Sequence, residues 1–367
     1  MISRWQFFLL TINYILGTTF FVLISRLVKQ GGQDTWLMPL WAGSFGILCA
    51  LFWMVLFRWH PGKSLPQIAL AVCGRPLGTA MSMLFFFYFS VLAGWVLRNL
   101  SDFMNATIMP ETPKSVFHIS FLLVACYTVA LGVESVARLN QLVTPFLFFP
   151  FWFVLLLAAV NWDWNRFQPV LASEIWRNML EAHFFLGFPY METFAMTMFL
   201  PLVKQDGNRA FVLGIATATL SLSMTLFMII GLLGVDRASR LTYPIYIVVQ
   251  EVAIGEMIVN IHSVISVVLL ILIFIKLLVL VYGAYESLRH VFRPKRQWPH
   301  FLALTLLLSG IAASIYENPI QNGEWNEKYT FAFDSFFVLF LPFLLLAASW
   351  LRRKFNRRNH WNKRSAN

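Results

Sequence analysis

Long apolar runs separated by short polar connections make up most of the chain. Ten of these runs come close to the roughly 20 residues that a helix needs to cross a bilayer. The pattern predicts an all-α integral membrane protein, with ten transmembrane helices within residues 1–351 and a tail at 352–367. The approximate limits of the ten runs are 5–26, 36–57, 78–101, 116–135, 141–160, 183–203, 209–234, 260–287, 298–316 and 331–351.

The sixth run, 183–203, contains residues that should interrupt its helix. Gly187 has no side chain to restrict its backbone conformation. Pro189 lacks an amide hydrogen and clashes with the preceding turn. A break here frees backbone polar groups, which persist inside a membrane only when protein buries them or when they line a watery cavity. Because the carboxyl group of Glu192 follows at once, we predict a cavity at this break.

The first run repeats part of this pattern. It carries Leu16–Gly17 where the sixth carries Leu186–Gly187, and the two runs are five apart, so their helices should cross in opposite directions. Interrupted helices in matching positions of two halves indicate a transporter binding site, whereas glycine in membrane helices also serves close packing. We expect a five-plus-five inverted repeat, with halves at about 5–160 and about 183–351 and with breaks at Gly17 and Gly187.

Basic residues gather in alternate connections. With the N-terminus inside, 18 of the 28 Lys and Arg residues fall in cytoplasmic segments, eight in outer loops and two within runs. This bias predicts that both termini are cytoplasmic. The tail 352–367 has seven basic residues and no acidic one. Such a tail binds anionic lipid at about 1 kcal/mol per charge, and a solvated end is the simpler alternative.

Composition excludes several classes of function. The chain is 59% hydrophobic and 12% charged, against about 25% charged for soluble domains. The net charge of +11 lies mainly in connections between spans, so nucleic acid is not an expected partner. We expect no enzyme activity, metal or cofactor, because the seven histidines are scattered and Gly62–Ser64 lacks the first glycine of a phosphate loop. The odd set Cys49, Cys73 and Cys126 predicts no disulfide framework.

Three connections should contain short helices. Ser64–Gly74 predicts a capped cytoplasmic surface helix, Phe167–Ala182 an outer amphipathic segment, and Tyr243–Glu256 an outer lid. Each could equally be a passive helix at the membrane interface.

Five stretches stand out: ILGT (15–18), GFPYME (187–192), NRFQPVL (165–171), SLPQIALAVCGRPLG (64–78) and the start of the lid at Tyr243–Pro244. Together they resemble the B subunit of bacterial spore germinant receptors, a branch of the amino acid–polyamine–organocation superfamily. One departure is Asn260–His262, which stands where we expect an arginine–acid pair. The resemblance implies a LeuT-like fold, partner A and C subunits in the spore inner membrane, and a small germinant, usually an amino acid, bound between spans one and six.

Ionisable groups inside the runs should have partners, since each costs roughly 2.5–3.5 kcal/mol at a helix centre. Those considered are Arg98, Glu192 and Lys276. We expect Arg98 to pair with Asp102 one turn on. Lys276 could donate to carbonyl groups freed near Gly17, occupying the place where related transporters bind sodium, or it could be purely structural. Glu192 could carry a proton, bind an amine or pair with Lys276.

The predicted ligand site lies around the two breaks. Thr18 and Thr19 could present hydroxyl and amide groups, Tyr88 could form a wall, and Phe188 and Tyr190 could shape the side-chain end; each has an ordinary packing role as the alternative. The full predicted ligand-binding set is Gly17, Thr18, Thr19, Tyr88, Gly187, Phe188, Pro189, Tyr190 and Glu192, with Glu192 and Lys276 as candidates for ion or proton coupling.

Two functions fit these residues. The first is a receptor subunit that binds a small amino-acid-like ligand and acts with partner subunits to trigger germination. The second is a proton-coupled amino acid transporter with Glu192 as carrier. The residues do not separate the two, and only the family resemblance favours the receptor. They also do not identify the ligand.

Overall fold

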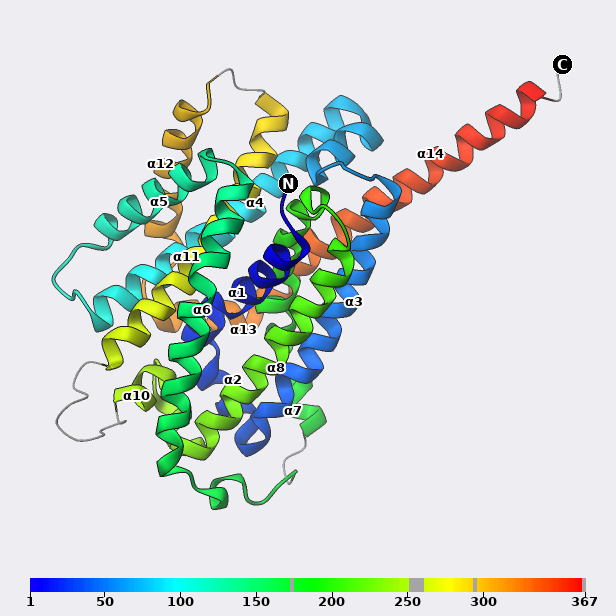
Figure 1. Cartoon of the computed structure of the whole chain (residues 1–367). Helices are drawn as coiled ribbons and strands as arrows, with labels where there is room; N and C mark the ends of the chain where they lie inside the picture. The colour runs from blue at the N-terminus through cyan, green and yellow to red at the C-terminus, as the bar shows by residue number, and fades with distance from the viewer. Residues whose placement is uncertain (172–174, 251–260, 293–295, 365–367) are drawn as a thin grey trace.

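The computed structural model describes residues 1–171, 175–250, 261–292 and 296–364. Within these ranges the chain is helical, and its helices pack into one bundle (Figure 1). The α-helices are α1 (Arg4–Val22), α2 (Ile24–Gly31), α3 (Met38–Trp59), α4 (Leu65–Thr107), α5 (Lys114–Ala130), α6 (Val133–Ala158), α7 (Ile175–Glu181), α8 (Gly207–Leu233), α9 (Val235–Arg240), α10 (Pro244–Gln250), α11 (Ile261–Phe292), α12 (Trp298–Ser314), α13 (Pro319–Asp334) and α14 (Leu341–Arg364).

Tighter or wider helical turns join several of these helices. They are η1 (Gly32–Leu37), η2 (Ala159–Asn161), η3 (Trp164–Phe167), η4 (Leu186–Tyr190), η5 (Met191–Met198), η6 (Leu200–Leu202) and η8 (Ser335–Phe340). Two of them, η4 and η8, are π-helical. The carbonyl group of Val338 in η8 accepts a hydrogen bond from the Trp53 indole at 2.6 Å, which anchors the α13–η8–α14 rod to α3.

Six helical stretches in the described residues are long and apolar enough to cross a membrane, and the α5 and α12 helices are shorter apolar ones. The chain is therefore a multi-pass integral membrane protein. The prediction of ten spans goes beyond these helices and remains a prediction. The six long stretches are Ile24–Trp59, Leu65–Thr107, Val133–Asn161, Gly207–Leu233, Val264–Phe292 and Ile320–Lys354.

The predicted break at Gly17 is wrong. Helix α1 runs regularly through Gly17, and its interruption comes at Leu23, before α2. The glycine lets α1 approach α11 closely, because a Cβ atom there would lie 2.8 Å from the carbonyl oxygen of Leu272 and 3.1 Å from Cβ of Lys276. The packing role that is common for glycine in membrane helices explains this residue.

The predicted break in the sixth run is confirmed. Inside η4 the backbone leaves helical geometry at Phe188, which is extended at φ −105° and ψ 117°, next to Pro189. The chain then re-forms as the 3₁₀ helix η5. Unlike Gly17, Gly187 is followed by a proline that removes an amide donor, which is why the helix ends here.

Both described ends of the chain lie at the same end of the bundle. The Ile2 amide donates to the Leu202 carbonyl at 3.0 Å, and Arg4 lies 3.6 Å from Asp206. Near the other terminus, the Arg353 guanidinium donates to the Trp59 carbonyl at 2.7 Å. Helix α14 then extends well beyond the bundle (Figure 1). Termini on one side agree with the predicted topology; that this side is cytoplasmic stays a prediction.

The predicted connecting helices are partly described. The Ser64 amide donates to Gln67 Oε1 at 3.0 Å at the start of α4, and the first segment of α4 ends at Gly74, where φ is +77°. The outer segment contains α7, and the lid begins as α10. The rest of the lid, 251–256, and Asn260 of the departure noted above lie outside the described residues.

Candidate functional site

The break at η4–η5 lies beside α1. The Tyr14 hydroxyl of α1 donates to the carbonyl oxygen of Glu192 at 3.0 Å, satisfying a backbone acceptor next to the break. This hydrogen bond holds α1 against the broken helix. Both Tyr14 and Glu192 are buried, so this contact fixes the Glu192 backbone inside the bundle.

A buried ion pair forms at this point. The Lys276 ammonium of α11 donates to Glu192 Oε2 at 2.5 Å and to the Thr18 hydroxyl at 2.8 Å. It also lies 4.5 Å from the ring centre of Phe188 and 5.1 Å from that of Tyr14, within the range of cation–π attraction. Lys276 is fully buried, so these groups replace its water shell. Of the three roles considered for Glu192, its pairing with Lys276 is confirmed.

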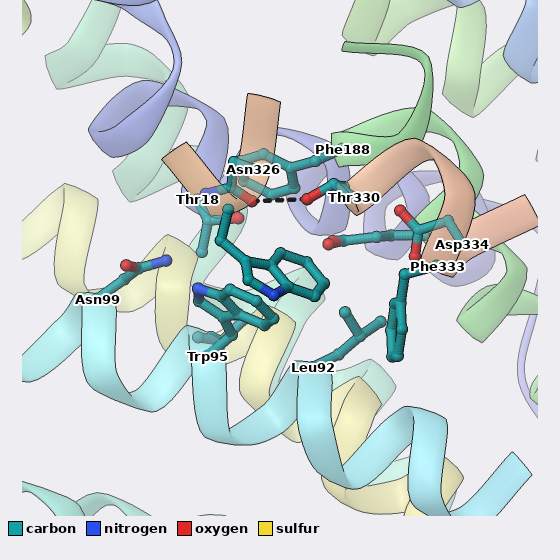
Figure 2. Close-up of a pocket in the computed structure, with 12 residues that line it drawn as sticks. Thr18, Leu92, Trp95, Asn99, Phe188, Asn326, Thr330, Phe333 and Asp334 are labelled. Carbon is teal, nitrogen blue, oxygen red and sulfur yellow. Dashed lines mark hydrogen bonds between the residues drawn. The ribbon is translucent and has the colours of Figure 1, made fainter. Parts of the chain in front are cut away.

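A small cavity opens on the other side of Glu192. It is bounded by α1, the broken helix, α4 and α13, and Figure 2 shows Leu92 and Trp95 rising from α4 toward Thr330 of α13. It admits the centre of a water molecule over about 20 Å³, which is room for about one water. The lining residues are Thr18, Leu92, Trp95, Val96, Asn99, Phe188, Glu192, Trp325, Asn326, Thr330, Phe333 and Asp334.

Two indole rings close part of this cavity. Trp95 of α4 and Trp325 of α13 have ring centres 4.3 Å apart, and the Trp95 indole donates to Asn322 at 2.7 Å. Because the space behind them holds about one water, a molecule as large as an amino acid needs side chains to move before it fits. In this sense the cavity is occluded.

The structure brings together only part of the predicted ligand-binding set. Thr18, Phe188 and Glu192 line the cavity, and Lys276 bonds to two of these three. The Thr19 hydroxyl instead donates to the carbonyl of its own helix at Ile15, the ordinary alternative for a membrane threonine.

The two predicted tyrosines lie behind the cavity wall. The Tyr88 hydroxyl donates to Asp334 Oδ1 at 3.1 Å, so it contacts a lining residue without itself lining the space. The Tyr190 hydroxyl points toward the Pro39 carbonyl, 3.3 Å away, and the Tyr190 ring packs on Gly46 of α3. Tyr190 therefore holds the broken helix against α3.

The predicted glycines and Pro189 shape the backbone and do not line the cavity. A Cβ atom at Gly187 would lie 2.9 Å from Asp334 Oδ2 and 3.0 Å from Thr330 Cγ2, so this glycine lets α13 lie against the broken helix. Gly17 does the same for α1 and α11. Pro189 acts by removing a backbone donor at the break.

Sequence reasoning missed the contribution of α13. Asn326, Thr330 and Asp334 line the cavity, and Asp334 is a fully buried carboxyl group inside the predicted span 331–351. A signal was present, because Asn322, Asn326, Thr330 and Asp334 recur at intervals of four and so share one helix face. Trp95 and Trp325 carried no such signal, since ring contacts across helices leave no local pattern.

The predicted Arg98–Asp102 pair is confirmed at 3.2 Å. Arg98 does more than pair, because its guanidinium also donates to the carbonyl groups of Ala312, Ala313 and Glu317 at the end of α12. A cation at a helix C-terminus is favoured by the helix dipole. This residue ties α4 to α12 and takes no part in the cavity.

The sequence of this chain is similar to sequences of known membrane proteins. A family model described as spore germination protein matches residues 1–322. The chain belongs to this family. Within it, this chain is a non-enzymatic membrane protein with a transporter-like fold. Similar curated proteins, all from Bacillus subtilis (strain 168), include spore germination protein B2, 23% identical over 351 residues and 94% of each chain, and spore germination protein KB, 23% identical over 363 residues and 96% of each. Spore germination protein YndE is 23% identical over 301 residues, covering 80% of this chain and 82% of its own.

The fold of this spore germination protein is similar to that of a solved transporter. A Na⁺-coupled sialic acid symporter in a substrate-bound outward-open state superposes with a TM-score of 0.67 at 11% identity, over 92% of this chain and 78% of the symporter. The likeness establishes an all-helical, multi-span fold similar to that of a LeuT-fold sodium symporter.

Proposed function

We propose that this chain is the ligand-sensing membrane subunit of a spore germinant receptor, and that a small amino-acid-like germinant binds in the cavity beside η4–η5. The observation that carries this proposal is the buried Lys276–Glu192 pair at the edge of a polar cavity at a helix break. Glu192 lines the cavity, where its carboxylate can take part in charge-assisted hydrogen bonds with the polar groups of an amino acid. Family membership supports germination as the response.

Binding would have to enlarge the occluded cavity. A ligand shifts a conformational equilibrium only as far as its affinities for the two states differ. We infer that the ligand favours a state in which Trp95 and Trp325 separate, and that partner A and C subunits respond to this state. The relatives spore germination proteins B2 and KB support assembly with other subunits.

The proposal assigns direct ligand contact to Thr18, Phe188 and Glu192, which line the cavity. The remaining predicted residues, including Tyr88 and Tyr190, would support the site from behind. We further propose a five-plus-five inverted repeat of ten spans, with both termini cytoplasmic. The basic end of α14, where Arg352 and Arg353 contact the carbonyls of Ala71 and Trp59, would then meet anionic lipids.

The test is binding of the twenty proteinogenic amino acids and of nucleosides to the purified full-length protein by calorimetry. We expect at least one amino acid to bind, and Glu192→Gln to weaken it about tenfold or more, because a charge-assisted bond is replaced by a neutral one. The introduced amide still accepts the Lys276 bond but leaves the Lys276 charge without its counter-ion, so affinity is compared at equal concentrations of folded protein. Tyr190→Phe is the matched control with unchanged affinity. Equal weakening in both variants, or no amino acid binding, contradicts the proposal.

A second function, proton-coupled amino acid transport with Glu192 as carrier, is favoured by the structural likeness to a symporter. The two are separated by reconstitution. Substrate accumulation in vesicles that contain this chain alone supports transport, whereas co-purification with two partner subunits and no accumulation supports the receptor.

Sodium should have no effect on ligand binding. We propose that the Lys276 ammonium, bonded to Thr18 and Glu192, takes the place of a coupling cation at the contact between α1 and α11. The amino acid dissociation constant should then agree within twofold in sodium and in choline chloride of equal ionic strength. A tenfold or greater sodium requirement would refute this role for Lys276.

A further inference from the structure

A stripe of buried polar side chains runs along one face of α13. Asn322, Asn326, Thr330 and Asp334 recur every four residues and expose 4%, 8%, 5% and 0% of their surface. They are linked, since the Asn326 amide donates to Asn322 Oδ1 at 2.9 Å and the Thr330 hydroxyl donates to Asn326 Oδ1 at 2.9 Å, the bond dashed in Figure 2. Burying a polar group costs free energy unless the group is hydrogen-bonded. The hydrogen bonds along the stripe offset this cost.

The stripe begins in a hollow at the end of the bundle away from the termini. This hollow lies between α2, α4, α9 and α13, and its lining includes Asn99, Asp102, Tyr316 and Asn322 together with the guanidinium side chains of Arg26 and Arg240. Asn99 lines both the hollow and the occluded cavity, and its side-chain oxygen accepts from Asn322 at 3.2 Å. The hydrogen-bonded side chains thus connect the hollow to the cavity.

The stripe ends at a carboxyl group with a free acceptor. Asp334 Oδ1 accepts from Tyr88, but Oδ2 is buried and has no hydrogen-bond partner among the described residues. Asp334 lines the cavity, whose lining holds two carboxyl groups, those of Glu192 and Asp334, and no basic side chain. The Lys276 ammonium bonds to Glu192 and Thr18. Within the described part of the chain, the Asp334 carboxyl group therefore has no ion-pair partner.

We propose that Asp334 is the docking group for the ammonium of the ligand, with Thr330 and Asn326 beside it as neutral hydrogen-bonding partners. This inference rests on the proposed function and narrows its ligand class. The site takes small molecules that carry a primary ammonium, and it rejects neutral or purely anionic molecules of the same size.

The experiment compares each amino acid that binds with the 2-hydroxy acid of the same side chain, on the purified full-length protein. We expect the wild type to prefer the amino acid at least tenfold, because the hydroxy acid leaves the Asp334 carboxyl unpaired. Asp334→Asn should weaken amino acid binding about 100-fold and leave hydroxy acid binding within threefold. The asparagine oxygen still accepts from Tyr88, so the change removes charge with little change of shape.

Glu286→Gln is the matched control. Glu286 is a buried carboxyl group of α11 that does not line the cavity, and the same carboxyl-to-amide change there should leave amino acid affinity unchanged. Unchanged amino acid binding in Asp334→Asn overturns the inference and leaves the proposed function standing. If Asp334→Asn does not fold, equal wild-type affinity for the amino acid and the hydroxy acid overturns it. If the wild type binds no amino acid, the proposed function fails and the inference fails with it.

Discussion

Lys276→Met should destabilise the protein by about 3–5 kcal/mol, because it leaves the Glu192 carboxylate buried without its counter-ion. Methionine keeps the length and apolar stem of lysine, so the loss is of charge and hydrogen bonds rather than of volume. The Lys276 ammonium also bonds to Thr18, so α1 loses a contact with α11. Equilibrium unfolding in mixed micelles measures the effect.

The double variant Lys276→Met with Glu192→Gln tests whether the unpaired Glu192 carboxylate causes this loss of stability. Removing both charges should recover much of the loss, since replacing a whole buried pair often leaves stability nearly unchanged. The interaction energy of the cycle should then be about 2 kcal/mol or more. Additive losses in the double variant would show that the two groups do not depend on one another, contrary to the buried pair described here.

Gly17→Val should cost about 3 kcal/mol, at the upper end of what overpacking a core usually costs. The first added carbon would lie 2.8 Å from the Leu272 carbonyl oxygen, which is backbone and cannot rotate away. Helices α1 and α11 must separate, and this moves Lys276 relative to Thr18. We therefore expect ligand affinity to fall together with stability.

Gly310→Val is its matched control. Gly310 is an exposed residue of α12, and a Cβ atom there would meet no other atom within 4 Å. The substitution places the same β-branched residue in a helix without the steric conflict, so only the difference in helix propensity, below 1 kcal/mol, remains. Equal losses at the two positions would show that close α1–α11 packing is not what requires glycine at Gly17.

Local chemistry made part of the site predictable from sequence. The break near Pro189 follows from one missing amide hydrogen. The sequence also showed that Lys276 must have a partner, because it is a cation in the middle of an aliphatic run. It did not show which one, and Glu192 was one of several candidates. Position along the chain does not say which of two distant helices face one another.

What escaped prediction depends on such distant contacts. Gly17 and Gly187 share a Leu-Gly pattern, yet the first allows close packing on α11 and the second lies at a break, because only the second is followed by proline. Tyr190 faces α3 because of how the chain turns after the break, which no local pattern fixes. Asp334 could have been found, since its four-residue spacing with Thr330 and Asn326 is visible in the sequence.

The most direct test of the account is an electron cryomicroscopy structure of the full-length protein with a bound amino acid from the binding screen. We predict ligand density between Thr18 and Asp334 in an enlarged cavity, with Trp95 and Trp325 further apart than 4.3 Å between ring centres. Ligand density elsewhere on the protein, with these two rings still in contact beside the small cavity, would contradict it.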